Sequence, residues 1–391
     1  MSKKFAFLVH DPLMMVHYKD VWKALGGSNF VIITTKFFAK DDEGNERLGL
    51  SSFLEQVKDQ GYEIRPVDEV ITNGVKFKYV ITNHIISGSI SKIKFEPVSY
   101  ILKLINHGLS IIGCSPIKKY EADINTYLPL QIGKKQIRYM YGADISDGWS
   151  LQPWNEIYDI FLCHGVNDER ELKKRFKGKT FVMGYPRYDR YFSEEIDLTP
   201  IRSEFSIDRS KKTILWMPTL GGEYSSIPLF AEALSKLKDK FNIIVRPHPL
   251  SFVQEKDFIV ILENCNFNID EVALRDMNEL FSIADVILTD NGGTPFSGIF
   301  LGKNVVFLDV PDASVESKSD NSSILAGSSV MELKKHLPSI SIKDLSPLET
   351  MLESSDFYKE NDACVEMLFK KYFDSPRGNG AQRVANFFQS L

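Results

Sequence analysis

The chain has 391 residues, of which 43% are hydrophobic and 25% are charged, and these globular values exclude a largely disordered protein. A chain of this length is expected to form about two or three domains, each large enough to bury its own core. The formal net charge of -5 at pH 7 argues against a general nucleic-acid binder, because such proteins usually carry an excess of basic residues.

Cysteine usage and hydrophobicity predict neither a metal site nor a membrane span. The four cysteines, Cys114, Cys163, Cys265 and Cys364, form no CxxC or Cys/His cluster, so structural zinc and a disulfide framework are not expected. The apolar run near the N-terminus is too short for a signal peptide, and no stretch approaches the ~18 apolar residues of a membrane span. We expect a cytoplasmic protein without cofactor or metal, and contact with the inner face of the cell membrane stays open.

Strands alternate with helices along the first half of the chain. Short buried strands are predicted at residues 5–9, 30–35, 78–83, 109–114, 160–165 and 180–184, and helices at 17–25 and 51–60. Strands separated by segments of helix length are typical of βαβ units and a parallel sheet. This alternation predicts one doubly wound domain over residues 1–200.

A polar, charged stretch at residues 191–212 is the best candidate for a domain boundary, and the same alternation restarts after it. Strands are predicted at 213–218, in the segment 242–249, at 285–290 and at 304–311, and helices at 227–241 and 277–284. A second domain is therefore expected over residues 210–375. The predicted fold class is α/β, with two facing Rossmann-like doubly wound domains and a cleft at the carboxyl ends of their strands.

The segment "RPHP" (246–249) places a cationic pair directly after a predicted strand. Proline fixes its own φ and favours extended geometry in the residue before it, so the strand exit is held straight as far as Arg246 and His248. The segment is either an ordinary surface turn or part of a binding site.

A second segment, "TDNGGTPFS" (289–297), joins a predicted strand to a helix through two glycines. The free N–H groups of such a helix start, together with two hydroxyl groups, would bind an anion, although helix capping alone is the simpler alternative. Parallel strands end at the same edge of a sheet, so a diphosphate could lie between this turn and the "RPHP" segment. The candidate residues of the turn are Asp290, Asn291, Gly292, Gly293, Thr294 and Ser297, and Thr219, Gly221 and Gly222 are candidates for a third wall.

Five segments in order resemble the CDP-glycerol glycerophosphotransferases of teichoic-acid synthesis, a family with two facing Rossmann-like halves (the GT-B architecture). They are "GYPRYD" (184–189), "TILWMPT" (213–219), "RPHP" (246–249), "ADVILTDNGGTPFSGIFLGK" (284–303) and "GNGAQR" (378–383). The resemblance implies that His248 contacts the donor pyrophosphate and that the turn from Asp290 to Ser297 holds phosphate and ribose. It also places Arg187 near the interdomain cleft and Arg383 in a closing segment, 376–391, whose helix returns toward the N-terminal domain. Both arginines are predicted to bind the nucleotide or its phosphates.

The sequence departs from this family at the position of the usual catalytic base. Members carry a Trp-His-Gly segment before "GYPR", and its histidine is taken as the base that activates the acceptor hydroxyl; here Tyr141 stands in that place. Asp144 or Asp147 in the following loop is the preferred candidate base, because a carboxylate there would project into the cleft. His164 is an alternative, and His10 is an acceptor-side candidate because it leaves the first strand.

The sequence predicts a metal-independent transferase that moves glycerol phosphate, or a related polyol phosphate or sugar, from a CDP- or CMP-linked donor. The acceptor would be a hydroxyl of a cell-surface polymer or lipid-linked precursor. Three alternatives stay open: a nucleotide-sugar glycosyltransferase of capsule or lipopolysaccharide synthesis, a UDP-sugar 2-epimerase-like enzyme, and a non-catalytic nucleotide-binding subunit.

Two smaller features are also ambiguous. The basic run at residues 170–179 is either a solvated helix face or a contact with anionic lipid, which would give a peripheral membrane protein. His17, His84 and His107 are expected to be structural or surface residues.

Overall fold

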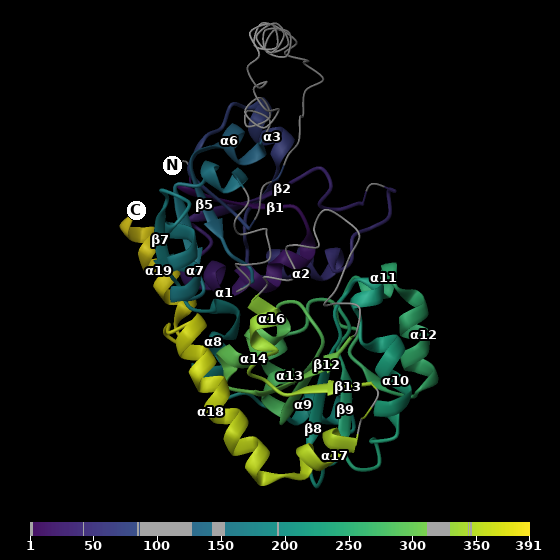
Figure 1. Cartoon of the computed structure of the whole chain (residues 1–391). Helices are drawn as coiled ribbons and strands as arrows, with labels where there is room; N and C mark the ends of the chain where they lie inside the picture. The colour runs from purple at the N-terminus through teal and green to yellow at the C-terminus, as the bar shows by residue number, and fades with distance from the viewer. Residues whose placement is uncertain are drawn as a thin grey trace, which may run out of the picture.

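The computed structural model describes residues 3–41, 43–83, 86, 127–142, 153–193, 195–310, 329–342, 344 and 346–391. These residues form two separate parallel sheets, each flanked by helices, which lie one above the other in Figure 1. No helix in the described ranges is long and apolar enough to cross a membrane. The predicted α/β class with two doubly wound units is confirmed.

The first sheet has the order β3-β2-β1-β4-β5-β6-β7, and every neighbouring pair is parallel. The inner strands β1 and β2 are buried on both faces, which explains why they are runs of apolar residues. In chain order they are β1 (Phe5–Val9), β2 (Phe30–Thr34), β3 (Ile64–Pro66), β4 (Phe77–Thr82), β5 (Gly133–Tyr139), β6 (Ile160–Cys163) and β7 (Lys179–Val182).

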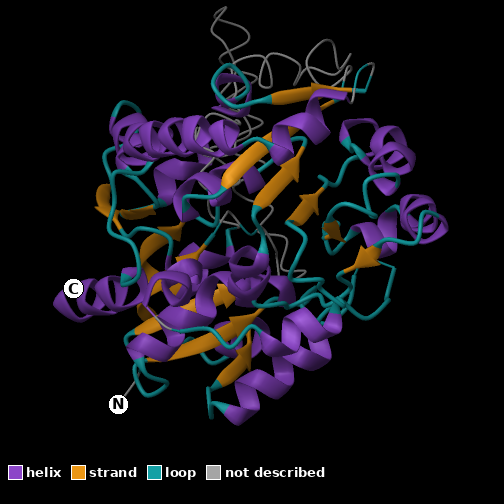
Figure 2. Ribbon diagram, turned by 90° about the horizontal axis from the view of Figure 1, so that it is seen from below, coloured by secondary structure: helices purple, strands orange, loops and turns teal. Residues whose placement is uncertain are grey.

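Helices cover both faces of this sheet, as the view from below shows (Figure 2). Helix α1 buries Tyr18, Val21, Trp22 and Leu25, the i, i+3, i+4 spacing that points an apolar stripe toward the sheet. The described helices here are α1 (Met15–Leu25), α2 (Leu50–Asp59), α3 (Val67–Thr72), α6 (Leu128–Ile132) and α7 (Val166–Lys173), with the 3-10 turns η1 (Pro12–Met14) and η3 (Pro153–Ile157).

The second sheet has the order β10-β9-β8-β11-β12-β13 and is also parallel throughout. Its strands are β8 (Thr213–Met217), β9 (Asn242–Val245), β10 (Asn268–Ile269), β11 (Val286–Thr289), β12 (Asn304–Asp309) and β13 (Ser339–Ser341). The helices of this unit are α9 (Thr199–Glu204), α10 (Ile227–Ser235), α11 (Ser251–Gln254), α12 (Lys256–Asn264), α13 (Met277–Ile283), α14 (Thr294–Leu301), α16 (Ser329–Leu333), α17 (Ser346–Glu353) and α18 (Ser355–Tyr372), with η5 (Gly222–Tyr224).

Both sheets reverse their strand order at an equivalent place. The reversal lies between β1 and β4 in the first sheet and between β8 and β11 in the second. In open α/β sheets, ligands bind outside the carboxyl ends of the strands at such a switch point. The loops that follow these four strands are therefore the first place to look for a site.

The predicted elements agree with the structure in kind but not always in extent. The predicted helix at 227–241 is too long: α10 ends at Ser235, and the chain continues in tighter turns, with bonds such as the Leu237 N–H to the Leu234 carbonyl (3.0 Å). Strands β3, β5, β10 and β13 and helices α12 and α18 were not predicted. The strand predicted at 109–114 lies outside the described residues.

The chain passes between the two units twice, and the passages lie side by side. The first runs through η4 (Pro186–Tyr188) and α8 (Asp189–Ser193), and the second joins α18 to α19 (Gly380–Ser390). Helix α18 lies along the second unit, while α19 packs against α1 of the first (Figure 1). The Asp189 carboxylate accepts the N–H groups of Gly380 (2.8 Å) and Ala381 (2.7 Å), which anchors the start of α19. The domain limits at 200, 210 and 375 stay a prediction.

Backbones approach closely where the second passage meets the first unit. The Val166 N–H donates to the Phe373 carbonyl (2.9 Å), and a Cβ on Gly165 would lie 2.3 Å from the carbonyl oxygen of Tyr372. Gly184 has φ +82° and its added Cβ would lie 2.6 Å from the carbonyl oxygen of Pro376. Only glycine permits this contact without a shift of the backbone.

We expect Gly165→Ala to destabilise the protein by roughly 1–3 kcal/mol, because the methyl group would overlap the backbone of residues 372 and 373. Chemical denaturation measures the change in the free energy of unfolding. Gly142→Ala is the matched control, since an added Cβ there meets nothing within 4 Å. Equal stability of the two variants would contradict this account of the passage.

Candidate functional site

A cavity of about 510 Å³ is lined by residues from both units. Its walls come from the loops that follow β1, β4, β8 and β11, the four strands at the two switch points, with further residues from α1 and η4 and from the loops after β5 and β9. The described residues that line the cavity include three arginines, Arg187, Arg246 and Arg275, and one carboxylate, that of Asp11. This excess of positive charge favours an anionic ligand.

The wall from the second sheet brings together most of the predicted phosphate-binding residues. The lining residues are Thr219 after β8, Arg246 and His248 after β9, and Asn291, Gly292, Gly293 and Thr294 after β11. His248 and the two glycines thus face one cavity, which was the central spatial expectation from the sequence. The first-turn N–H groups of α14 have no partners within their own helix.

Asp290 holds the loops of this wall together through hydrogen bonds to their backbone. Its buried carboxylate accepts N–H groups of Thr219 (2.9 Å), Ser226 (2.7 Å) and Asn291 (2.7 Å). Burial raises the pKa of this carboxyl group, and the three hydrogen bonds oppose that rise. Asp290 therefore ties the loop after β8 to the turn after β11, and Gly292, with φ +75°, makes the turn.

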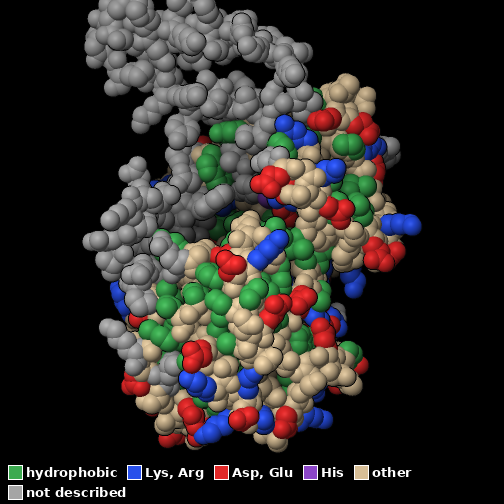
Figure 3. Space-filling model, turned by 90° about the vertical axis from the view of Figure 1, so that its right-hand side faces the viewer, with side chains coloured by type: hydrophobic (Ala, Val, Ile, Leu, Met, Phe, Trp, Pro, Cys, Tyr) green, Lys and Arg blue, Asp and Glu red, His purple; other side chains and the backbone are tan. Residues whose placement is uncertain are grey.

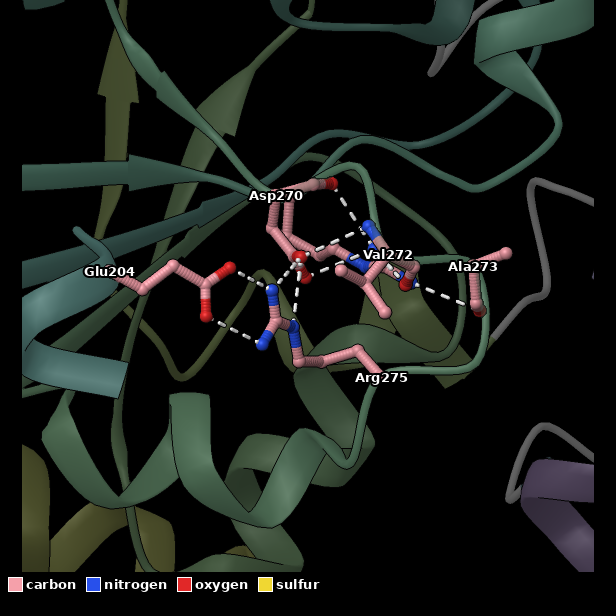
Figure 4. Close-up of polar contacts among 6 residues, drawn as sticks. Glu204, Asp270, Val272, Ala273 and Arg275 are labelled. Carbon is pink, nitrogen blue, oxygen red and sulfur yellow. Dashed lines mark hydrogen bonds and ion pairs between the residues drawn. The ribbon is translucent and has the colours of Figure 1, made fainter. Parts of the chain in front are cut away.

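Arg246 lines the cavity with much of its guanidinium group already engaged. It forms an ion pair with the fully buried Asp270 (3.0 Å) and donates to the carbonyls of Asp270 (3.1 Å), Val272 (2.8 Å) and Ala273 (3.4 Å). Arg275 pairs with the other oxygen of Asp270 (2.8 Å) and with Glu204 on α9, as Figure 4 shows. These bonds fix the loop at residues 270–275, part of which lines the cavity.

His248 is placed to donate a hydrogen bond into the cavity. Its Nδ1 accepts the N–H of Leu250 (3.2 Å), which leaves the proton of the neutral ring on Nε2. Burial lowers the pKa of His248, and Arg246 lowers it further, while Glu255 and Asp11 act in the opposite direction. At neutral pH the imidazole is therefore an uncharged N–H donor.

The wall from the first sheet carries the acceptor-side candidate His10 and the catalytic candidate Tyr141. His10 and Asp11 follow β1, Asn83 follows β4, Tyr141 follows β5, His17 lies on α1, and Arg187 lies in η4. The rings of His17 and Tyr141 meet edge to face at 5.6 Å. The sequence predicted a structural or surface role for His17 and did not predict its place on this wall. Its position in an amphipathic helix gave no sign of a binding site.

Burial keeps the histidines of this wall neutral. Burial and the nearby Arg47 lower the pKa of His10 to about 4. The pKa of His17 is held well below its usual value by burial first, and then by Arg187 and His164. For Tyr141, burial raises the pKa and Arg138 opposes the rise, so its hydroxyl stays protonated at neutral pH.

Several predicted site residues do not line this cavity. The N–H groups of Gly221 (2.9 Å) and Gly222 (2.7 Å) donate to Glu255, and the Ser297 hydroxyl lies 2.9 Å from that of Tyr188. Arg383 donates to the carbonyl of Val182 (3.0 Å). Their predicted roles stay predictions.

His164 is enclosed behind the first-sheet wall. Its Nδ1 lies 2.9 Å from the Gly184 carbonyl, and its ring packs on Tyr185 with centroids 3.9 Å apart. Burial lowers its pKa to about 4. The other candidate bases, Asp144 and Asp147, lie outside the described residues, as do His84 and His107.

The described residues include no group of three or more His, Cys, Asp and Glu side chains that could hold a metal ion. On the face in Figure 3, acidic and basic side chains are interspersed over the second unit. Two lysines of the basic run at 170–179 are paired with acidic residues: Lys173 with Glu169 (2.7 Å) and Lys174 with Glu171 (2.7 Å).

Residues 158–389 match the family model described as CDP-Glycerol:Poly(glycerophosphate) glycerophosphotransferase. The teichoic acid glycerol-phosphate primase of Bacillus spizizenii is 26% identical over 172 residues, which cover 40% of this chain and 42% of the relative. A teichoic acid poly(glycerol phosphate) polymerase of the same organism is 27% identical over 218 residues, 53% of this chain and 52% of the relative. The chain thus spans about half or less of the length of these relatives.

Solved structures with the same fold cover nearly the whole chain. The wall teichoic acid polymerase TagF has a TM-score of 0.59 at 14% identity, over 99% of this chain and 88% of that one. A TagF variant soaked with CDPG has a TM-score of 0.57 at 16% identity, with coverages of 100% and 89%. The S. aureus MnaA structure with UDP has a TM-score of 0.55 at 12% identity, with coverages of 99% and 96%. At these identities the likeness supports the GT-B architecture.

We expect Asp270→Asn to lower the free energy of unfolding by roughly 3–5 kcal/mol, because it leaves two largely buried arginines without their shared carboxylate. Glu232→Gln, which breaks an exposed ion pair with Lys236, is the control and should cost less than about 1 kcal/mol. Urea denaturation of both variants measures the difference. A small effect of Asp270→Asn would show that the network does not fix the loop.

Proposed function

Because the chain belongs to the CDP-glycerol:poly(glycerophosphate) glycerophosphotransferase family, we propose that it is a glycerophosphotransferase acting on a cell-surface polymer. The donor is CDP-glycerol or a closely related CDP-linked polyol, and the acceptor is a hydroxyl of the polymer or of its lipid-linked precursor. One observation carries the proposal: His248 and the Gly292–Gly293 turn line the same arginine-rich cavity.

The second-sheet wall suits the diphosphate of the donor. The Nε2–H of His248 would donate to one phosphate, and the free N–H groups at the start of α14 would bind the other. Hydrogen bonds to charged groups contribute roughly 1.5–3 kcal/mol each, so two or three of them supply substantial binding energy. Thr219 and Thr294 add hydroxyl groups on the same wall. Gly221, Gly222, Ser297 and Arg383 contribute, under this proposal, by supporting the surrounding loops.

The reaction is an in-line displacement at phosphorus. The acceptor oxygen forms a bond to the β-phosphorus of the donor, the bond from that phosphorus to the bridging oxygen breaks, and CMP leaves with the electron pair. The hydroxyl proton passes to a base. Charge then accumulates on the departing phosphate, where His248 and the α14 N–H groups would stabilise it.

The proposed base is Asp144 or Asp147. Tyr141 is a poor base because its phenol is protonated at neutral pH, but its hydroxyl can orient the acceptor. His164 is enclosed, and its lowered pKa makes it a weak proton acceptor.

Acidic residues beside and within the segment 170–179 oppose its contact with anionic lipid. Glu169 and Glu171 pair with lysines of this segment, which reduces its net attraction for an anionic surface. A cytoplasmic protein that meets the inner face of the membrane through its acceptor needs no such patch.

We expect His248→Ala to abolish transfer from CDP-glycerol and to weaken CDP binding roughly 10- to 100-fold, because one charge-assisted hydrogen bond is lost. Calorimetric titration with CDP and a transfer assay with a glycerol-phosphate oligomer measure the two effects. His336→Ala, at an exposed histidine outside the cavity, is the control. An active His248→Ala variant, or tighter binding of UDP than of CDP, would overturn the proposal, the latter in favour of an epimerase-like enzyme.

We expect the affinity for CDP to rise as the pH falls below 6.5, because His248, whose pKa is lowered, becomes protonated in that range. The protonated imidazole adds positive charge beside the phosphate, and by linkage the bound anion raises its pKa. CDP itself titrates near pH 6, so the wild type must be compared with His248→Gln by titration between pH 5 and 8. Parallel pH profiles of the two proteins would exclude His248 as the group responsible.

A further inference from the structure

Arg187 is a cavity-lining cation whose guanidinium group forms no hydrogen bond or ion pair with any described residue. Its guanidinium carbon lies 4.9 Å from the centre of the Tyr188 ring. Asp20 and Asp276 act on it only through space. A guanidinium group has five N–H donors, so leaving all of them unused beside a cavity favours an anionic ligand.

The neighbours of Arg187 are equally unsuited to neutralising it. His17 lines the same cavity, and its side chain has no hydrogen bond to any described residue; its ring meets Tyr141. The two histidines around it, His17 and His164, are neutral because burial lowers their pKa, so neither can form an ion pair with the guanidinium group. By contrast, the other two arginines of the cavity share the carboxylate of Asp270.

Arg187 does not lie on the wall that is proposed to hold the donor. It lies in η4, which packs against α1, the helix that carries His17. Both residues therefore belong to the first-sheet wall, while His248 and the glycine turn belong to the second. A donor diphosphate bound to the second wall would leave the first wall for a different anion.

We propose that Arg187 and His17 form an anion subsite that binds a phosphate of the acceptor, next to the hydroxyl that attacks the donor. The ligand class is the polyol-phosphate end of a chain, in which a phosphodiester lies a few bonds from a free hydroxyl. The guanidinium group binds two phosphate oxygens, and a ring N–H of His17 donates to the same group. Binding the phosphate fixes the hydroxyl in line with the donor. This inference rests on the proposed function, because it assumes that the donor occupies the second wall.

The test is to titrate sn-glycerol 3-phosphate into the full-length protein saturated with CDP. CDP blocks the donor wall, so the wild type should bind the probe at the remaining subsite, and glycerol without phosphate should not bind. Arg187→Gln should lower the affinity for sn-glycerol 3-phosphate about 10-fold or more while leaving the affinity for CDP unchanged. His248→Ala should show the reverse pattern. Arg190→Gln, which removes an arginine already paired with Asp276 and Glu279, is the matched control.

The outcomes separate the subsite from the donor site. If CDP does not bind the wild type, the proposed function fails. If CDP binds but the probe does not, or if Arg187→Gln weakens CDP rather than the probe, the subsite is wrong. Should Arg187→Gln fail to fold, Arg187→Lys and His17→Gln provide the same comparison, each with weaker probe binding and unchanged CDP affinity.

Kinetics with two acceptors identify the source of the phosphate. A soluble glycerol-phosphate oligomer and a detergent-solubilised lipid-linked glycerol phosphate present the same group on a polymer and on a lipid. Arg187→Lys should raise the KM for the acceptor that uses the subsite, with kcat changed much less. An unchanged KM for both acceptors would overturn the proposal.

Discussion

The Asp290 carboxylate is the interaction on which the geometry of the donor wall depends. A single buried side chain accepts backbone N–H groups from the loop after β8 and from the turn after β11. These two strands are neighbours, and the reversal of strand order leaves a crevice between their exits. Because both loops are held by the same carboxylate, the hydroxyl of Thr219 and the glycine turn cannot move independently. The N–H groups of α14 are then presented to the cavity in a fixed direction, which is the condition for electrostatic preorganisation.

The charged residues around the cavity fall into two groups with different physical roles. Arg246, Arg275 and Asp270 satisfy one another in the buried network of Figure 4, so their charges hold the loop at 270–275 in place. Arg187 has no such partner among the described residues and retains its full hydrogen-bonding capacity. A buried cation is costly unless it is paired, so the pairing of Arg246 stabilises the fold. Arg187 is half-buried with its donors unused, which favours a ligand. Residue type alone does not distinguish these roles.

This distinction also marks the limit of sequence reasoning for the chain. The strands that were predicted, such as β1, β2 and β11, are apolar runs bounded by polar turns, and their parallel pairing followed from the helices between them. Strand β5 was missed because Gln136 and Arg138 interrupt its apolar pattern; both are buried, and Arg138 is held by the Asn155 side chain (2.5 Å). The phosphate turn was predicted because glycines and hydroxyl groups beside a strand end are a local signal. The partner of Arg246 lies 24 residues away on the chain, so the sequence could predict the cation but not that it is already bound.

The spacing between the two walls of the cavity also depends on contacts between the units that lie away from the cavity. Two contacts that join the units involve the backbone: the Val166 N–H donates to the Phe373 carbonyl, and the Asp189 carboxylate accepts N–H groups from the first turn of α19. Burial raises the pKa of Asp189 to about 6, so at pH 7 the group is mostly ionised and its charge favours the N-terminus of α19. Asp189 follows Arg187 by two residues, within the same "GYPRYD" segment. The segment that presents the Arg187 guanidinium group to the cavity therefore also anchors the returning helix, and the position of Arg187 on the first-sheet wall is coupled to the way the two units are joined.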